Sequence, residues 1–183
     1  IGTFYPGFGS GGYCIPLSSQ YVLRGAKIKK KLSILKNTIE IDKNINLMIA
    51  KSIVKEKVKK IAVLGLSYKA DLKVSTLSPI IDFCKYLKQK KLKIELFDPY
   101  YNNQETKNIV NCNKIKTFPN GLSKYDCVVF AVDHKYFLEK KKQILNSLNC
   151  KLFFDNTGFF KQNLNYFKKK GINYKLAGSE NWL

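Results

Sequence analysis

One cysteine of this chain lies in a glycine-rich segment that is suited to thiol chemistry. The segment reads Gly7-Phe8-Gly9-Ser10-Gly11-Gly12-Tyr13-Cys14-Ile15-Pro16, and Pro6 precedes it. Glycines permit positive φ and a close approach of a ligand to backbone N–H groups, while the two prolines stiffen the edges of the segment. A thiolate held on such a loop is a strong nucleophile. The alternative is a flexible leader in which Cys14 is an ordinary small apolar residue.

A second segment, far along the chain, decides between these two interpretations. Residues 61–79 contain a short apolar run, the turn Gly65-Leu66-Ser67-Tyr68-Lys69 and the helix start Ser78-Pro79. The two segments resemble, in the same order, two motifs of the UDP-glucose/GDP-mannose dehydrogenase family. These motifs are the active-site pattern Pro-Gly-x-Gly-x-Gly-Gly-x-Cys-Ile/Phe-Pro and the turn Gly-Leu-x-Phe/Tyr-Lys. The resemblance covers nearly all of the chain.

The resemblance implies a domain order and a reaction. Members of the family carry an NAD-binding domain first, then a helical linker domain, then a Rossmann-like domain for the nucleotide of the sugar nucleotide. Residues 1–58 are therefore expected to hold the cysteine loop and a helical dimerisation segment, and residues 59–183 a UDP-sugar-binding domain. The family oxidises the C6 alcohol of the sugar to a carboxylate in two hydride transfers to NAD, through a cysteine thioester, for polysaccharide biosynthesis.

The same resemblance assigns roles to individual residues. Cys14 would be the nucleophile that forms the thioester. The predicted substrate-binding residues are Phe8, Gly9, Gly11, Gly12, Tyr13, Tyr68 and Lys69, and the backbone N–H groups of Gly11, Gly12 and Tyr13 are expected to line the pocket. The chain is expected to be a truncated or naturally short C-terminal portion that lacks the NAD-binding domain, binds no cofactor or metal by itself and is inactive alone.

Several positions depart from the family pattern. Ser18 stands where relatives have an aspartate that helps with proton transfer, and Thr76 and Thr157 stand where arginines are expected. Lys73-Val74 replace an acidic pair. A serine cannot act as a general base as an aspartate does, and lost arginines remove bidentate contacts to phosphate. A non-catalytic subunit that binds a nucleotide sugar or assembles with a partner therefore stays open as the alternative.

From Lys60 onward, short apolar runs alternate with amphipathic segments. Strands are predicted at 61–66, 93–97, 127–132, 152–155 and 173–176, and helices at 78–90, 135–146 and 161–169, with a weaker candidate at 102–113. Such alternation predicts an α/β fold, a doubly wound parallel sheet with its ligand crevice at the carboxyl ends of the strands. Asp98, Asp133 and Asp155 follow strands there and are expected to cap turns or helices, and His134 is expected to belong to the same helix start. No Gly-x-Gly-x-x-Gly fingerprint follows the first strand, so no nicotinamide site is predicted.

Two helices are predicted before the sheet. Ser18 and Ser19 are plausible N-caps of a short helix at 20–29, and a long amphipathic helix is expected at 32–57. Its apolar stripe is predicted to be buried, in the protein's own core or against a partner; its members are Ile34, Leu35, Thr38, Ile41, Ile45, Met48, Ile49 and Ser52. By resemblance this helix would form a homodimer interface.

Composition excludes several other classes. The net charge of +20 comes almost entirely from lysine, since Arg24 is the only arginine, and scattered lysine runs are typical of solvated helix faces rather than of nucleic-acid-reading surfaces. Five cysteines without a Cys-x-x-Cys pair and a single histidine, His134, argue against a disulfide framework or a zinc site. No apolar run has the roughly 18 residues of a membrane span. A cytoplasmic protein is therefore expected.

Overall fold

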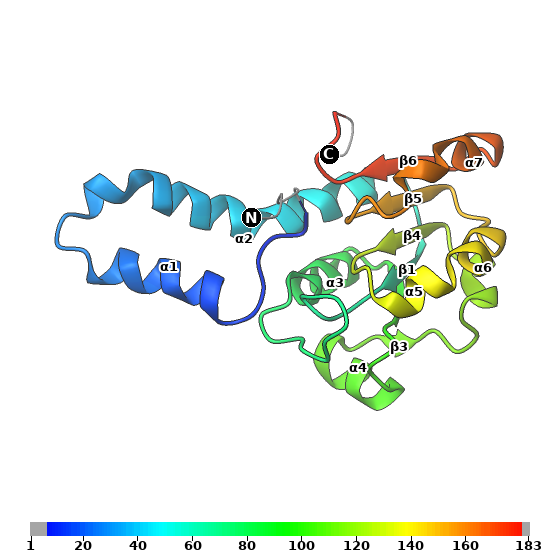
Figure 1. Cartoon of the computed structure of the whole chain (residues 1–183), viewed down its shortest axis with the longest axis horizontal. Coiled ribbons are helices and arrows are strands. Elements are labelled where there is room, and N and C mark those ends of the chain that lie inside the picture. Colours follow the sequence, from blue (N-terminus) through cyan, green and yellow to red (C-terminus); the bar gives the residue numbers. More distant parts are fainter. Residues whose placement is uncertain (1–6, 181–183) are drawn as a thin grey trace.

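A six-stranded parallel sheet forms the centre of the protein (Figure 1). The computed structural model describes residues 7–180, so Pro6 and the other residues of 1–6 and 181–183 lie outside the described part. The strands are β1 (Lys60–Leu64), β2 (Lys93–Phe97), β3 (Asn113–Lys114), β4 (Cys127–Phe130), β5 (Leu152–Asp155) and β6 (Asn173–Leu176). The helices are α1 (Cys14–Gly25), α2 (Ser33–Lys55), α3 (Pro79–Gln89), α4 (Asn103–Val110), α5 (Lys135–Glu139), α6 (Lys141–Asn146) and α7 (Leu164–Lys169). Short 3-10 turns cover Lys29–Leu32, Asn120–Lys124 and Lys161–Asn163.

The order of the strands across the sheet is β3-β2-β1-β4-β5-β6, and every neighbouring pair is parallel. Ile61 of β1 pairs with Ile94 of β2 on one side and with Cys127 of β4 on the other. The chain therefore winds outward in both directions from β1 and β4, which is the Rossmann-like, doubly wound arrangement. The predicted α/β class is confirmed.

Side chains that alternate along the strands divide the core into two apolar layers. Ile61 and Val63 face one layer, which includes residues of α2, α3 and α4. Ala62 and Leu64 face the other layer, which includes residues of α5, α6 and α7. Because both faces of the central strands are covered, the strands read as near-continuous apolar runs in the sequence.

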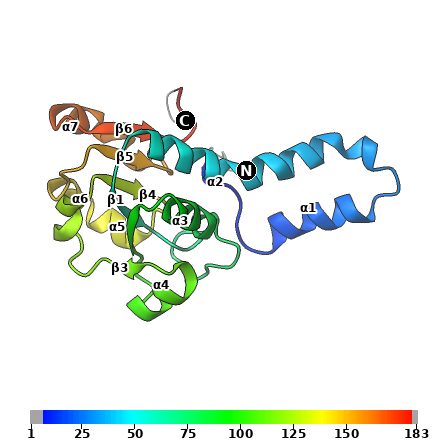
Figure 2. The ribbon, with the colours of Figure 1, turned by 180° about the vertical axis from the view of Figure 1, so that it is seen from behind.

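Residues 14–45, here called the arm, project away from the sheet as α1 and the first half of α2 lying side by side (Figures 1 and 2). No residue of α1 is buried, and the buried residues of α2 begin only at Asn46. Burial of the predicted stripe in the protein's own core is therefore wrong for Ile34 and Ile41, which are 82% and 64% exposed. Within residues 7–180, no helix has both the length and the hydropathy required to cross a membrane.

The first helix begins earlier than predicted. It starts at Cys14 rather than at residue 20, so Ser18 and Ser19 lie inside it, and the Ser19 hydroxyl donates to the Ile15 carbonyl at 3.0 Å. Pro16 does not prevent this, because the N–H groups of the first helical turn have no intrahelical acceptor and a proline there loses nothing.

The weak helix candidate is α4, and its boundaries have local causes. The Asn102 side chain accepts from the Glu105 N–H while the Glu105 carboxylate accepts from the Asn102 N–H, which forms a capping box. Asn111 ends the helix in the left-handed region, with φ 52°. Two of the asparagines that argue against a helix interior therefore define its ends.

Candidate functional site

A groove lies between the glycine-rich segment, α2 and the loops that follow β1 and β5. Its cavity volume is about 970 Å³. All eight predicted site residues line it: Phe8, Gly9, Gly11, Gly12, Tyr13, Cys14, Tyr68 and Lys69. Residues that were not predicted to bind ligand line it as well: Gly7, Ser10, Ile15, Thr38, Ile41, Asp42, Ile45, Asn156 and Thr157. The fold thus brings the two motif segments to one place, while the role of each residue stays a prediction.

Cys14 is the first residue of α1, and its side chain is exposed. Tyr13, directly before it, is 65% exposed. Ser18 is also exposed and lies four residues further along the same helix, which places it about one turn from Cys14. The thiol is therefore open to reagents and ligands, and the neighbouring turn offers a hydroxyl where an aspartate was expected.

Phe8 anchors the glycine-rich segment to the core of the sheet. Its side chain is 2% exposed, and its ring centroid lies 4.8 Å from that of Phe83 on α3 and 5.8 Å from that of Phe154 on β5. The side chain is therefore a core residue, and only the Phe8 backbone is left to contact a ligand.

Two glycines of the segment allow it to lie directly on Tyr68. A Cβ on Gly11 would lie 2.4 Å from Cβ of Tyr68, and one on Gly12, which has φ +76°, would lie 2.8 Å from its Cζ. The Gly12 N–H donates to the Thr76 carbonyl at 3.0 Å. The expectation that this N–H faces a ligand is therefore corrected, because the group already has a backbone acceptor.

Asp42 of α2 holds the segment from the other side. Its Oδ1 accepts from the Ser10 N–H and its Oδ2 from the Ser10 hydroxyl, each at 2.7 Å. The sequence offered only a weak signal for this clamp. Asp42 interrupts the apolar stripe of the long helix between Thr38 and Ile45, and nothing in the sequence pairs it with Ser10.

Lys69 is carried by the loop of residues 65–77, here called the lysine loop. Internal hydrogen bonds shape this loop: the Ser67 hydroxyl donates to the Leu72 carbonyl at 2.5 Å, and the Tyr68 N–H to the Val74 carbonyl at 3.1 Å. Lys69 is exposed, and it contributes the one basic side chain among the described residues that line the groove. An anionic group in the groove could therefore pair with Lys69.

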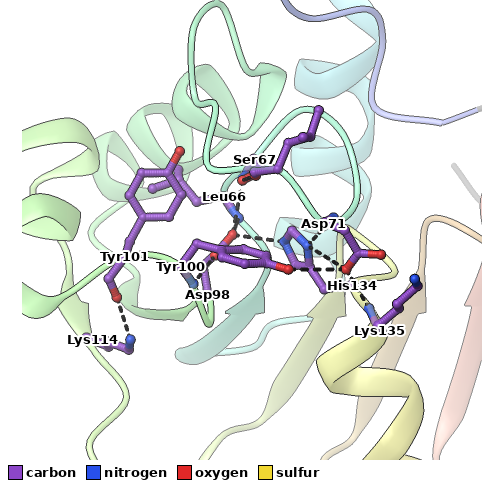
Figure 3. A network of polar contacts seen from close by, with 10 residues as sticks. Leu66, Ser67, Asp71, Asp98, Tyr100, Tyr101, Lys114, His134 and Lys135 are labelled. Atoms are coloured by element: carbon purple, nitrogen blue, oxygen red, sulfur yellow. Dashed lines mark hydrogen bonds and ion pairs between the residues drawn. The ribbon is translucent and has the colours of Figure 1, made fainter.

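A buried polar network joins the lysine loop to the ends of β2 and β4 (Figure 3). The Asp98 carboxylate accepts from the N–H groups of Leu66 and Ser67 and lies 3.1 Å from Nε2 of His134. His134 Nδ1 accepts in turn from the Asp71 N–H at 2.9 Å. Burial by itself would raise the pKa of Asp98, but the hydrogen bonds from His134 and from backbone N–H groups outweigh it and lower that pKa. Asp98 was expected to cap a turn, but its carboxylate also joins the lysine loop to His134 after β4.

Thr157 and Asp155 form the side of the groove at the end of β5. Asp155 Oδ1 accepts from the N–H groups of Thr157 and Gly158, at 3.0 Å and 2.9 Å, and Asp155 Oδ2 from the Tyr174 hydroxyl. The Thr157 hydroxyl accepts from the Phe159 N–H at 3.3 Å. Asp155 thus caps the turn after β5, as its position at the end of a predicted strand indicated. Thr157 supplies no charge to the groove.

The residues at the centre of the sheet do not fit a dinucleotide. A Cβ on Gly65 would lie 2.7 Å from Cβ of Val132, so the switch point between β1 and β4 is occupied by the protein's own side chain. Asp98 follows β2, where a dinucleotide fold places a carboxylate for the ribose, but it is fully buried and bonded to the chain itself. Within residues 7–180, no three His, Cys, Asp or Glu side chains group together as metal ligands.

Comparison with known proteins identifies relatives of both parts of the chain. Residues 62–162, more than half of the chain, match the family described as the UDP-glucose/GDP-mannose dehydrogenase family, UDP binding domain. The UDP-N-acetyl-D-mannosamine dehydrogenase of Methanococcus maripaludis is 27% identical over 192 residues, which cover all of this chain and 42% of the relative. Protein CapL of Staphylococcus aureus is 28% identical over 166 residues, which cover 38% of its own length. The chain thus spans about two-fifths of the length of these relatives.

Solved structures share the fold. The structure of the UDP-D-ManNAc dehydrogenase from Pyrococcus horikoshii aligns with a TM-score of 0.75 at 22% identity and covers 97% of this chain and 41% of that one. The UDP-N-acetyl-mannosamine dehydrogenase Cap5O from Staphylococcus aureus aligns with a TM-score of 0.74 at 18% identity over 100% of this chain and 42% of that one. At these identities the likeness establishes the arrangement of helices and strands.

Proposed function

The chain belongs to the UDP-glucose/GDP-mannose dehydrogenase family, and from this premise we propose that it is the sugar-nucleotide-binding, thiol-bearing portion of a nucleotide-sugar 6-dehydrogenase. In this proposal residues 1–58 supply the cysteine loop and the assembly helix, and residues 59–183 bind the UDP part of a UDP-sugar. Three of the proteins named above, from Methanococcus maripaludis, Pyrococcus horikoshii and Staphylococcus aureus (Cap5O), are named as dehydrogenases of UDP-N-acetyl-mannosamine, which makes a UDP-N-acetylhexosamine the first substrate class to test.

The observation that carries the proposal is the shared groove. An exposed thiol, an exposed lysine and two exposed aromatic rings line one cavity of about 970 Å³, although they come from segments far apart in the sequence. A diphosphate requires a cation, which Lys69 supplies, and a uracil or sugar face packs well on tyrosine rings such as Tyr13 and Tyr68. The mixture of apolar surface and a few polar groups is typical of small-ligand sites.

The chemistry assigned to this chain is confined to its own residues. The Cys14 thiolate would add to an aldehyde carbon at C6, forming a C–S bond while the carbonyl electron pair moves to oxygen and takes a proton from water. The hydride transfers of the family need a nicotinamide site, and the residues described here do not form one. They would depend on an NAD-binding domain supplied from outside residues 1–183.

Removal of the Lys69 charge should weaken binding of UDP-sugars. We expect Lys69→Ala to lose about 1 kcal/mol or more of binding free energy, roughly fivefold in affinity, which is the contribution of one charge-assisted hydrogen bond. Isothermal titration with UDP, UDP-glucose and a UDP-N-acetylhexosamine measures this. The matched control is Lys135→Ala, which removes an exposed lysine at the same edge of the sheet but outside the groove. Equal losses in the two variants, or no binding of any of the three ligands to the native chain, would contradict the proposal.

A non-catalytic binding or assembly subunit is the second candidate. Ser18 and Thr157 favour it, because neither supplies the charge that its place in the family pattern calls for. The two candidates differ in one measurement: both bind UDP, but only a catalytic portion should form a thiohemiacetal between Cys14 and a UDP-sugar C6 aldehyde. Native mass spectrometry without a reduction step, compared with Cys14→Ser, detects this adduct.

The exposed face of the arm supports assembly with a second copy of the chain. Ile34, Ile41 and Met48 recur every seven residues on α2, and they are 82%, 64% and 44% exposed. Tyr21 and Ile28, on or just after α1, are also more than half exposed. An apolar surface of this kind marks an interface, and we propose that the arms of two copies cover each other.

An acidic residue in the middle of this surface should separate the two copies. We expect Ile41→Asp to raise the dissociation constant of the homodimer at least about tenfold, because it buries an unpaired carboxylate. Sedimentation velocity over a concentration series measures this. Lys36→Asp is the matched control, since it adds the same carboxylate to an exposed position on another face of α2. A native chain that sediments as a monomer at all concentrations would contradict the proposal.

A further inference from the structure

The single histidine of the protein is fully buried, and both of its ring nitrogens are hydrogen-bonded. Nδ1 accepts from the Asp71 N–H at 2.9 Å, so this nitrogen carries no proton. The ring proton is therefore on Nε2, from which it is donated to Oδ2 of Asp98 at 3.1 Å. In this state His134 is neutral and connects the lysine loop to the end of β2 (Figure 3).

The groups around His134 give its two nitrogens different surroundings. On the Nε2 side, Asp98 also accepts from Leu66 and Ser67, and Lys114 of β3 interacts favourably with its charge. On the Nδ1 side lies the Asp71 carboxylate, with Oδ1 at 3.9 Å from the nitrogen. Two aromatic rings also pack against the imidazole. Its centroid lies 5.1 Å from that of Tyr100 and 5.7 Å from that of Phe137 on α5.

We propose that His134 is a positioning residue for the groove, which holds the lysine loop in its ligand-binding shape only while its imidazole is neutral. This inference rests on the proposed function, since it concerns how Tyr68 and Lys69 are presented to the ligand. A second hydrogen bond joins the loop to the β4 side of the sheet, where the Asp71 carboxylate accepts from the Lys135 N–H at 2.8 Å. A third joins it to the residues after β2, since the Tyr100 hydroxyl donates to the same carboxylate at 3.4 Å.

A second proton on His134 would reverse the hydrogen bond to the loop. Nδ1 would become a donor that faces another donor, the Asp71 N–H, whereas the bond from Nε2 to Asp98 would persist. Oδ1 of Asp71 could accept from this donor, but it is 3.9 Å away and already bonded to the Lys135 N–H. The loop must move for this oxygen to come within hydrogen-bond distance. Because the neutral form holds the loop, the order of the loop and its affinity for ligand should fall when acid adds this second proton.

Amide hydrogen exchange of peptides that span residues 66–77 tests the inference without a ligand. After correction for the intrinsic exchange rate, protection in the native protein should fall about tenfold between pH 7.5 and pH 5.5, the scale of one lost hydrogen bond. His134→Asn keeps an acceptor near the place of Nδ1 but cannot titrate, so its protection should stay high at both pH values. In His134→Leu the protection of the loop should be low at both pH values. Asp133→Asn, which changes the exposed neighbour of His134, is the control and should behave as the native protein.

Two results would overturn the inference. One is equal protection of the loop at both pH values in the native protein, and the other is the same loss of protection on acidification in His134→Asn. If His134→Leu does not fold, the other three proteins still decide. Titration with UDP at both pH values completes the test: the native affinity should fall at least about fivefold at pH 5.5 while that of His134→Asn does not. A loop that loosens without loss of affinity would refute the positioning role, whereas no UDP binding at pH 7.5 would refute the proposed function instead.

Discussion

Iodoacetamide in limiting amount should modify Cys14 at least about a hundredfold faster than any other cysteine, because the others react only from locally opened states. Cys14 is exposed, and Cys84, Cys112, Cys127 and Cys150 are buried. A hydrogen bond with Cys112 and burial raise the pKa of Cys84, and burial raises the pKa of Cys150 to about 12. The pKa of Cys112 is lowered by its hydrogen bond with Cys84, but this thiol is only 4% exposed.

The labelling has internal controls. Cys14→Ser should remain unlabelled in the native state over the same time, and it should show four labels after unfolding in guanidinium. Saturating UDP-sugar should slow the native reaction if the groove is the ligand site. Labels spread evenly over the cysteines of the native protein would mean that the glycine-rich segment does not hold Cys14 as described, and no ligand effect would count against the proposed function.

Replacement of the Phe8 side chain should detach the glycine-rich segment from the sheet. Phe8→Ala is expected to lower the free energy of unfolding by about 3–5 kcal/mol, the usual cost of truncating a buried phenylalanine. The reason is the loss of ring contacts with Phe83 and Phe154 in the core. Urea denaturation monitored by circular dichroism measures the change.

Leu164→Ala is the matched control for this variant. Leu164 is an apolar residue at the start of α7, outside the arm and the groove, and it is 50% exposed, so its truncation should change stability by less than about 0.5 kcal/mol. A loss below about 1 kcal/mol for Phe8→Ala would contradict the anchoring role. It would then favour the original expectation that Phe8 binds substrate.

The sheet was predictable because its pattern is local. Each strand is a short apolar run followed by turn residues, and the alternation with amphipathic helices leaves few topologies. β3 was not predicted, since only Asn113 and Lys114 pair and neither is apolar. The helix before it was underrated because its asparagines act as caps, which depends on side-chain hydrogen bonds rather than on propensity.

The site was only partly predictable, for a different reason. Motifs bring Cys14 and Lys69 to attention, but the contacts that place them join residues of unrelated local pattern, such as Ser10 with Asp42 and Asp71 with His134. Such pairs are fixed by the tertiary fold. The same limit explains Phe8, whose place in a glycine motif suggested a ligand contact and whose side chain instead fills the core.

The close approach of Gly65 and Val132 at the centre of the sheet has a thermodynamic consequence. Other doubly wound sheets bind ligand in a crevice between their two halves, whereas here the Val132 side chain packs against Gly65 at that place. Residues 7–14 form the second wall of the groove instead. A ligand held between the lysine loop and that wall would contact both. Docking of the cysteine segment and ligand binding are then reciprocally coupled. The factor by which the docked segment raises the affinity for ligand equals the factor by which bound ligand raises the equilibrium constant for docking.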